Sequence, residues 1–183
     1  MLTQYLFYLL LGLTTTLGFL TLFFWFHYNK FVRRRNQVKT DLSDIQIQIR
    51  RKIDLIESLS AVVKQYATHE KDTLVQTSQA RSQLDNSKST QDVAKADNML
   101  TQTLRSLFSV VEAYPKLQAN SQYKRLDKEL QNTENQIAEY RETYNKAVQR
   151  YNNGIQTFPC LLPATIFQFT PEPLFSDNLE KNA

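Results

Sequence analysis

The sequence predicts an all-α protein, with an N-terminal transmembrane helix followed by an antiparallel helical bundle of about four helices, two of them long. Three features point to this fold class: a long uncharged N-terminal segment, few glycines and prolines in the middle of the chain, and apolar residues spaced alternately three and four apart. Between Gly18 and Gly154 the one strong helix breaker is Pro115. A β-rich domain needs turn residues about every eight to twelve positions, so long helices are the expected structure.

The N-terminal segment is predicted to cross a membrane once. Residues 5–26 carry no charge over 22 positions, and as a helix they reach roughly 33 Å, enough for the hydrocarbon core of a bilayer. A cleaved signal peptide would begin with basic residues and end at a small-residue cleavage site, and neither feature is present. Trp25, Phe26 and Tyr28 lie at the end of the segment, where aromatic rings favour the membrane interface. We therefore expect an uncleaved anchor in residues 1–26.

A basic stretch follows the predicted span. Within ten residues that contain no acid, it holds Lys30, Arg33, Arg34, Arg35 and Lys39. Positive charge beside a span marks its cytoplasmic side. This predicts a single-pass protein of the cell (inner) membrane, with its N-terminus outside and its C-terminal bundle in the cytoplasm. The same residues are candidates for binding anionic membrane lipid, and the alternative is that they serve only to orient the span.

Residues 28–67 are predicted to form the first long helix of the bundle. Residues 44–49 alternate polar and apolar side chains as a strand would, but no turn residues flank them, so a helix is expected. The predicted apolar stripe consists of Phe31, Val38, Leu42, Ile45, Ile49, Ile56, Leu59, Val63 and Tyr66.

Four other side chains of this helix complicate the stripe. Arg35 and Lys52 interrupt it, and we expect their stems to lie along it while the charges stay in water. Ile47 and Ile53 are expected to widen the apolar face, as in a helix that contacts more than one neighbour.

The last long helix is predicted from about residue 120 to 157, with Asn120 as its N-cap. Beside its stripe, Glu134 and Arg141 are expected to form interhelical salt bridges rather than a binding site. The predicted stripe consists of Tyr123, Leu126, Leu130, Thr133, Ile137, Tyr140, Tyr144, Ala147, Tyr151 and Phe158.

A third helix is predicted to begin at Ser89 or Thr90, with Asp92 in its first turn. It should end near Tyr114, because Pro115 disfavours helical geometry in the residue before it. Its inward side chains are predicted to be Val93, Leu100, Leu104, Leu107, Val111 and Tyr114.

Residues 69–86 have a weaker apolar stripe, formed by Leu74, Thr77 and Leu84. They form either a separate short helix capped by Thr68 or a continuation of the first helix, and the separate helix is favoured.

The C-terminal tail cannot be one continuous helix, because residues 158–175 hold four prolines and four phenylalanines. It is more apolar than a disordered tail, so we expect it to pack on the bundle or at the membrane surface. The predicted domains are therefore the anchor 1–26, the bundle 27–158 and the tail 159–183.

The sequence offers little catalytic chemistry. A single cysteine, Cys160, excludes an internal disulfide and a multi-cysteine zinc site. His69 and Glu70 begin like a zinc-protease helix, but the second histidine four residues on is missing. We expect no catalytic, metal-binding or cofactor-binding residues, no cofactor and no enzymatic activity. The tyrosines of the last helix lie on its apolar stripe, so no nucleic-acid partner is expected.

Five motifs occur in order along the chain: 28-YNKFVRRRNQVK-39, 44-DIQIQIRRKIDLI-56, 62-VVKQYATHEKDTL-74, 112-EAYPKLQAN-120 and 133-TENQIAEYRETYNKAVQRYNNGIQTFP-159. Together they resemble the LemA family, over about residues 28–175. The resemblance implies a helical bundle behind a short N-terminal membrane anchor, with no established biochemical activity.

The family pattern falls on many polar and aromatic positions of this chain. Among them, Asp44, Arg51 and Asp54 join Glu134 and Arg141 as candidate interhelical polar residues. The others are Tyr28, Asn29, Asn36, Leu55, His69, Glu70, Arg81, Glu112, Tyr114, Pro115, Asn120, Asn135, Tyr144, Asn145, Tyr151, Asn152, Phe158 and Pro159.

Two positions depart from the family pattern. Glu57 stands where the family usually has a proline, so the kink expected there is predicted to be absent. Gln168 stands where the family usually has a glycine before the tail phenylalanine, Phe169, which leaves the tail conformation open.

The function expected from these features is that of a non-catalytic, membrane-anchored scaffold or interaction protein. One alternative is a self-assembling structural protein that shapes membrane or organises the envelope, and another is a cryptic hydrolase. The expected partners are membrane lipid and a protein that the sequence does not identify. The resemblance implies a membrane metalloprotease as one candidate, and a second copy of the chain is another.

Overall fold

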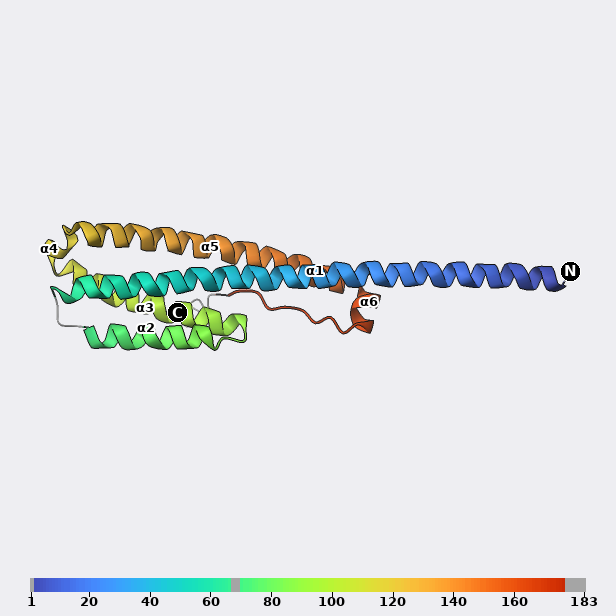
Figure 1. The fold of residues 1–183 in the computed structure, drawn as a ribbon, viewed down its shortest axis with the longest axis horizontal. Helices are drawn as coiled ribbons and strands as arrows, with labels where there is room; N and C mark the ends of the chain where they lie inside the picture. The colour runs from blue at the N-terminus through green and yellow to red at the C-terminus, as the bar shows by residue number, and fades with distance from the viewer. Residues whose placement is uncertain (1, 67–69, 177–183) are drawn as a thin grey trace. The chain divides into compact units, whose positions relative to one another are not determined.

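The computed structural model describes residues 2–66 and 70–176, and within these ranges the chain is helical and has no strand. The all-α prediction is confirmed. The helices are α1 (Leu2–Lys64), α2 (Glu70–Asp85), α3 (Thr90–Glu112), α4 (Pro115–Gln118), α5 (Ser121–Gln156) and α6 (Leu161–Ile166), shown in Figure 1.

The chain forms two compact units, and α1 and α5 each contribute to both. Within the described residues, the anchor unit comprises 2–38 and 147–172, and the bundle unit comprises 39–66, 70–146 and 173–176. These units differ from the three predicted segments, because the boundary falls inside α1 at Val38 and the C-terminal tail is divided between the units.

The bundle unit is an antiparallel arrangement in which α1, α2, α3 and α5 run in alternating directions (Figure 1). Helices α1, α3 and α5 bury most of the apolar stripe that their spacing predicts, and α2 buries Thr77 and Leu84 of its weaker stripe. Burying one large aliphatic side chain contributes about 1.5–3 kcal/mol. The core includes Ile45, Ile49, Ile53, Ile56 and Leu59 of α1, Ala80 and Leu84 of α2, Val93, Leu100, Leu104 and Leu107 of α3, and Leu126, Leu130 and Ile137 of α5.

Five predicted positions are wrong. Tyr114 is 39% exposed, because α3 ends at Glu112 and the stripe ends with it, and Leu74 of α2 is 45% exposed. Ile47 is 58% exposed, because it lies two residues, or roughly 200°, around the helix from both Ile45 and Ile49. Phe158 is 81% exposed, because α5 ends at Gln156 and the helical stripe ends with it. Lys52 does not hold its charge in water: its side chain is 0% exposed.

The helix ends follow the local sequence. Ser89 and Asp92 form a capping box at the start of α3, in which each side chain accepts the backbone N–H of the other at 3.2 Å. Pro115 occupies the first position of α4, where its missing N–H costs nothing. Asn120 caps α5 as predicted, since its Oδ1 accepts the N–H of Gln122 at 2.8 Å.

The segment after α1 begins a separate helix, α2, which starts at Glu70, so the predicted break is confirmed. Thr68, its predicted cap, and His69 lie outside the described residues. α1 itself continues past Glu57, the position of the usual family proline, to Lys64.

The tail contains the short helix α6, which is followed by a left-handed turn at Gln168. The N–H of Phe169 donates to the carbonyl of Ala164 at 3.0 Å, and the N–H of Gln168 donates to that of Thr165 at 3.2 Å. This pair of bonds defines a Schellman motif, whose left-handed residue is usually glycine. Gln168 occupies that position with φ of 56°. The chain therefore keeps the backbone conformation that suits the glycine usual in the family.

Gln168→Gly is expected to stabilise this turn by roughly 0.5–1 kcal/mol, because glycine adopts positive φ without the clash of a Cβ atom. Gln168→Val should weaken the turn, since a β-branched residue is strained there. Hydrogen exchange of the Phe169 amide reports the turn directly. Equal protection in the two variants would contradict this account.

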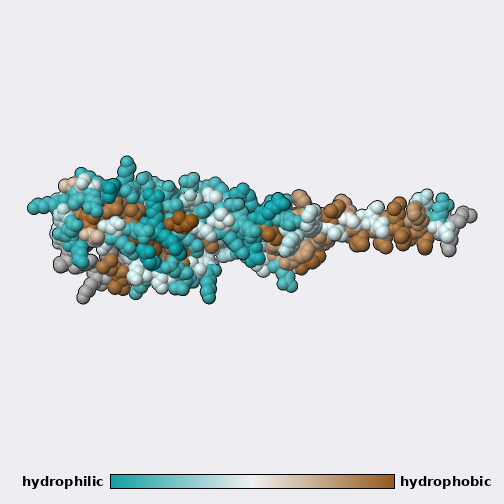
Figure 2. All heavy atoms as spheres, viewed as in Figure 1, coloured by the Kyte–Doolittle hydropathy of each residue, from teal (hydrophilic) through white to brown (hydrophobic). Residues whose placement is uncertain are grey.

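The N-terminal part of α1 qualifies by length and composition as a membrane span. An 18-residue window of this helix has a mean hydropathy of 1.9, and none of the window is buried. Its most hydrophobic side chains appear as brown patches, separated by paler residues, along the N-terminal part of the helix in Figure 2.

Candidate functional site

The basic stretch is divided between internal contacts and solvent. Arg34 Nη1 donates to the carbonyl of Arg150 at 3.0 Å, and Arg35 Nε lies 2.9 Å from Glu172 Oε1. Arg33 and Lys39 are exposed, and Lys30 is half-buried. Within the anchor unit, Lys30 and Arg33 are therefore better placed than Arg35 to meet a ligand outside the protein.

Lys30 and Arg33 border a groove at the end of the apolar segment. It has a volume of about 480 Å³ and is lined by Trp25, Phe26, Asn29, Lys30, Arg33 and Arg34. Its lining thus combines aromatic rings with cationic side chains. An amphipathic molecule with an anionic group matches this combination, because its apolar part can contact the rings while its charge meets the cations.

α5 passes close to α1 behind this groove. A side chain at Gly154 would overlap the guanidinium of Arg34 and approach the ring of Phe31. Glycine at this position therefore leaves room for the Arg34 guanidinium against the end of α5.

The tail is bound to α5 within the anchor unit by a tyrosine–asparagine pair. The Asn152 side chain donates to the carbonyl of Glu172 at 2.8 Å and accepts its N–H at 2.9 Å. The Tyr151 hydroxyl donates to the carbonyl of Thr170 at 3.0 Å. Burial raises the pKa of Tyr151, so the hydroxyl keeps the proton that it donates.

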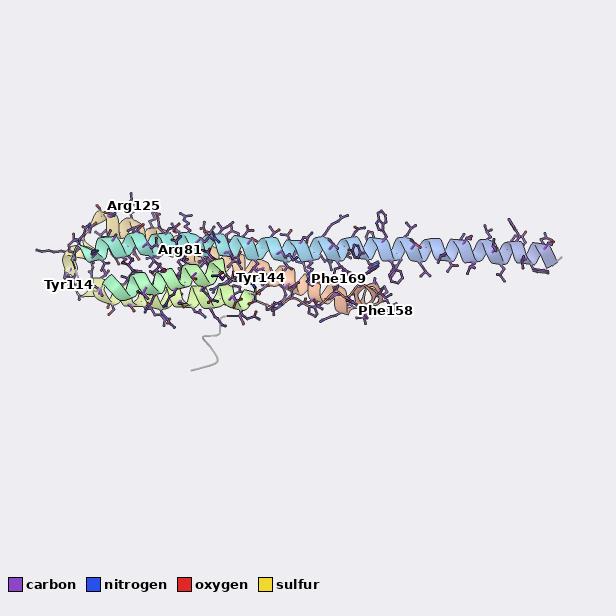
Figure 3. All side chains as sticks on the ribbon, turned by 60° about the horizontal axis from the view of Figure 1, so that its bottom comes forward. Arg81, Tyr114, Arg125, Tyr144, Phe158 and Phe169 are labelled. Carbon is purple, nitrogen blue, oxygen red and sulfur yellow. The ribbon has the colours of Figure 1, made fainter. Side chains whose placement is uncertain are left out.

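Aromatic side chains join the same tail to α1. The ring of Phe167 lies 4.9 Å from that of Tyr28, and the ring of Phe169 lies 5.4 Å from that of Phe31. Figure 3 shows Phe169 beside α1. The tail of the anchor unit is thus fixed by both polar and aromatic contacts.

A second tyrosine–asparagine pair, seven residues earlier, binds the tail within the bundle unit. Asn145 donates to the carbonyl of Phe175 at 3.1 Å and accepts its N–H at 2.8 Å. The Tyr144 hydroxyl donates to the carbonyl of Pro173 at 2.9 Å. These contacts recognise backbone groups, so they hold an extended segment largely independently of its side chains.

The bundle unit contains a buried network of charged residues. Lys52 Nζ lies 2.8 Å from Asp97 Oδ1 and 2.6 Å from Glu134 Oε1. It also donates to the hydroxyl of Thr101 at 3.1 Å. Arg141 binds the other oxygen of Asp97. Helices α1, α3 and α5 are therefore joined by opposite charges that pair with one another.

The remaining predicted interhelical residues lie outside this network. Asp54 pairs with Arg81 at 2.9 Å on the exposed side of α1 and α2. Hydrogen bonds to Glu57 and Asp54 raise the pKa of Arg81, which stays charged. Asp44 is half-buried and Arg51 exposed, and neither forms an ion pair with another residue that the structure describes.

The described ranges contain no group of three or more histidine, cysteine, aspartate or glutamate side chains that could hold a metal ion. His27 lies at the end of the apolar segment, where its Nδ1 is 2.8 Å from the carbonyl of Phe23. Cys160 is a free, half-buried thiol at the start of α6.

Asp97 and Glu172 form ion pairs with Lys52 and Arg35, and the sequence analysis identified neither of these acids. Asp97 could have been recognised, since it lies on the α3 stripe between Val93 and Leu100 at a spacing of four and then three. Glu172 lies among prolines in the tail, where no periodic pattern marks a position.

The comparison with known families covers most of this chain. The sequence model of the LemA family matches residues 41–183, which include both tyrosine–asparagine pairs and the charged network of the bundle unit. No curated protein matches the chain.

Proposed function

Since this chain belongs to the LemA family, we propose that it acts as a membrane-anchored scaffold, a helical bundle that binds a partner without catalysing a reaction. The observation that carries the proposal is the continuity of α1. One uninterrupted helix contains both the exposed apolar segment and the buried stripe of the bundle unit. Such a helix ties a folded interaction unit directly to a membrane.

The proposed orientation has the N-terminus outside the cell membrane and the bundle unit in the cytoplasm. It is supported by the basic stretch that follows the apolar segment. In a Cys160→Ser background, Lys128→Cys should react with an impermeant thiol reagent only after cell lysis, because Lys128 is exposed on α5. Thr3→Cys, before the span, should react in intact cells. The reverse pattern would contradict the orientation.

Anionic lipid is the proposed ligand of the groove beside Lys30 and Arg33. In vesicles containing the full chain, spin-labelled anionic lipid should associate with the protein more than neutral lipid does, and salt should weaken this preference. Arg33→Gln should reduce it by about 1 kcal/mol, or roughly fivefold. Arg35→Gln changes the net charge equally but removes a guanidinium already bound to Glu172, so its effect should be smaller. Equal losses would mean that net charge, rather than the groove, sets the preference. No loss in either variant would reduce the basic stretch to a topology signal.

The scaffold proposal is tested by crosslinking the full chain in intact membranes and identifying the captured proteins. Repeated capture of one other protein, lost when the bundle unit is unfolded, would support a scaffold. The alternative of self-assembly is supported by two large apolar side chains of α2 that are exposed to solvent, Leu74 and Val75. Ladders of self-crosslinked chains that Leu74→Gln abolishes would favour that alternative.

A further inference from the structure

Helix α6 has its large apolar side chains on the outside. The residues that it buries are Pro163 and Ala164, both small. Its exposed large apolar residues are Leu161, Leu162 and Ile166, and Ile166 is 62% exposed. A helix that folds against a protein in water has the opposite arrangement, with large apolar side chains facing the core.

Further exposed aromatic residues flank α6. Phe158 precedes it and Phe167 follows it, and both rings are largely or partly accessible. Residues 157–171 contain no charged side chain. In the described part of the anchor unit, large exposed apolar residues occur in two places, residues 5–28 of α1 and residues 158–167.

The contacts of Phe167 place these two apolar surfaces side by side. Its ring lies 6.3 Å from that of Phe24 and 4.9 Å from that of Tyr28, at the end of the predicted span. Between them lies an apolar groove of about 600 Å³, lined by side chains of residues 17–28 and by Phe167. Figure 2 shows the brown surface over α6 meeting that of α1.

The segment after α6 is held firmly enough to keep the helix in this position. Asn152 binds both backbone groups of Glu172, and the Glu172 carboxylate pairs with Arg35. Tyr151 binds Thr170. These bonds fix the tail beyond the left-handed turn at Gln168, so α6 cannot move far from the end of the span.

We propose that α6, with Phe158 and Phe167, is a second membrane-contacting element, whose exposed face lies in the interface of the bilayer that α1 crosses. The inference rests on the proposed anchoring of α1 in a membrane. The occupant of this face is lipid, because the face is continuous with the lipid-exposed surface of the span. A soluble partner covering it would have to enter the same interface.

The element gives the anchor unit two points of contact with the membrane. A single spanning helix can tilt and rotate about its axis. With α6 also in contact with lipid, α1 has one preferred rotation, in which the face shared with α6 is turned towards the membrane. Phe167 and Tyr28, which contact each other, would both lie at headgroup depth, where aromatic rings are favoured.

The test uses the full chain in vesicles, with an environment-sensitive fluorophore on one cysteine in a Cys160→Ser background. A label at Ile166→Cys should emit at a shorter wavelength than in water. Lipids with a nitroxide near the headgroup should quench most of its emission, more than lipids with a nitroxide deep in the chain. Lys128→Cys, on an exposed polar face of α5, should show neither effect.

A label at Leu13→Cys, within the span, tests the membrane anchoring of α1 separately from the membrane contact of α6. If the deep nitroxide quenches the label at Leu13 and no nitroxide lipid quenches the label at Ile166, α1 spans the membrane but α6 does not contact it. This result would overturn the inference. A blue-shifted Ile166 label that no nitroxide lipid quenches would mean that protein covers the face, and this also overturns it. If neither label is quenched, the anchoring of α1 fails together with the inference.

Discussion

Ile137→Asp is expected to unfold the bundle unit under conditions in which the parent chain stays folded. The Ile137 side chain is 1% exposed in the core. An unpaired carboxylate there costs several kcal/mol, whether it remains ionised or takes up a proton to avoid the charge. That cost is comparable with the roughly 5–15 kcal/mol that stabilises a typical domain.

Asn135→Asp is the matched control, because it introduces the same side chain two residues away on an exposed position of α5. Its expected effect lies within about 0.5 kcal/mol. Thermal unfolding of the full chain in detergent, followed by circular dichroism, compares the two variants. If their melting curves coincide, the burial of Ile137 is not what stabilises the bundle unit.

Asp97→Asn is expected to destabilise the bundle unit by about 3–5 kcal/mol, although the substitution hardly changes the shape of the side chain. It removes the negative charge that faces Lys52 Nζ at 2.8 Å, and the Lys52 side chain is 0% exposed. Arg141 loses the same partner. Lys52 then retains Glu134 as an acidic neighbour, and the side chain of Glu134 is 41% exposed.

Asp54→Asn removes the same charge from an exposed pair and should cost about 0–1 kcal/mol, because solvent screens the attraction between Asp54 and Arg81. Urea unfolding of both variants in the same detergent gives the difference. Equal losses would mean that the buried network contributes no more than a surface salt bridge does.

Spacing marks Lys52 and Asp97 as candidates for a buried pair without deciding that they pair. Lys52 lies on the α1 stripe between Ile49 and Ile56, and Asp97 lies on the α3 stripe between Val93 and Leu100. Opposite charges at stripe positions of two helices indicate a buried pair. When α1 is considered alone, however, its stripe is equally consistent with a lysine that extends its charge into water.

The sequence by itself determined the helices, because their periodicity, caps and breakers act within a few residues. The stripes of α1, α3 and α5, the capping box at Ser89 and the end forced by Pro115 are all local features.

The tertiary structure alone decided where Lys52 places its charge and which way α6 faces. Burial of Lys52 depends on acids 45 and 82 residues later in the chain, which no local pattern contains. The face of α6 depends on Phe167 meeting Phe24 and Tyr28, and on Asn152 binding the backbone of Glu172. Because Asn152 binds backbone groups, the contact places no requirement on the side chains of the bound segment. The sequence of that segment therefore does not indicate the contact, which only the folded structure shows.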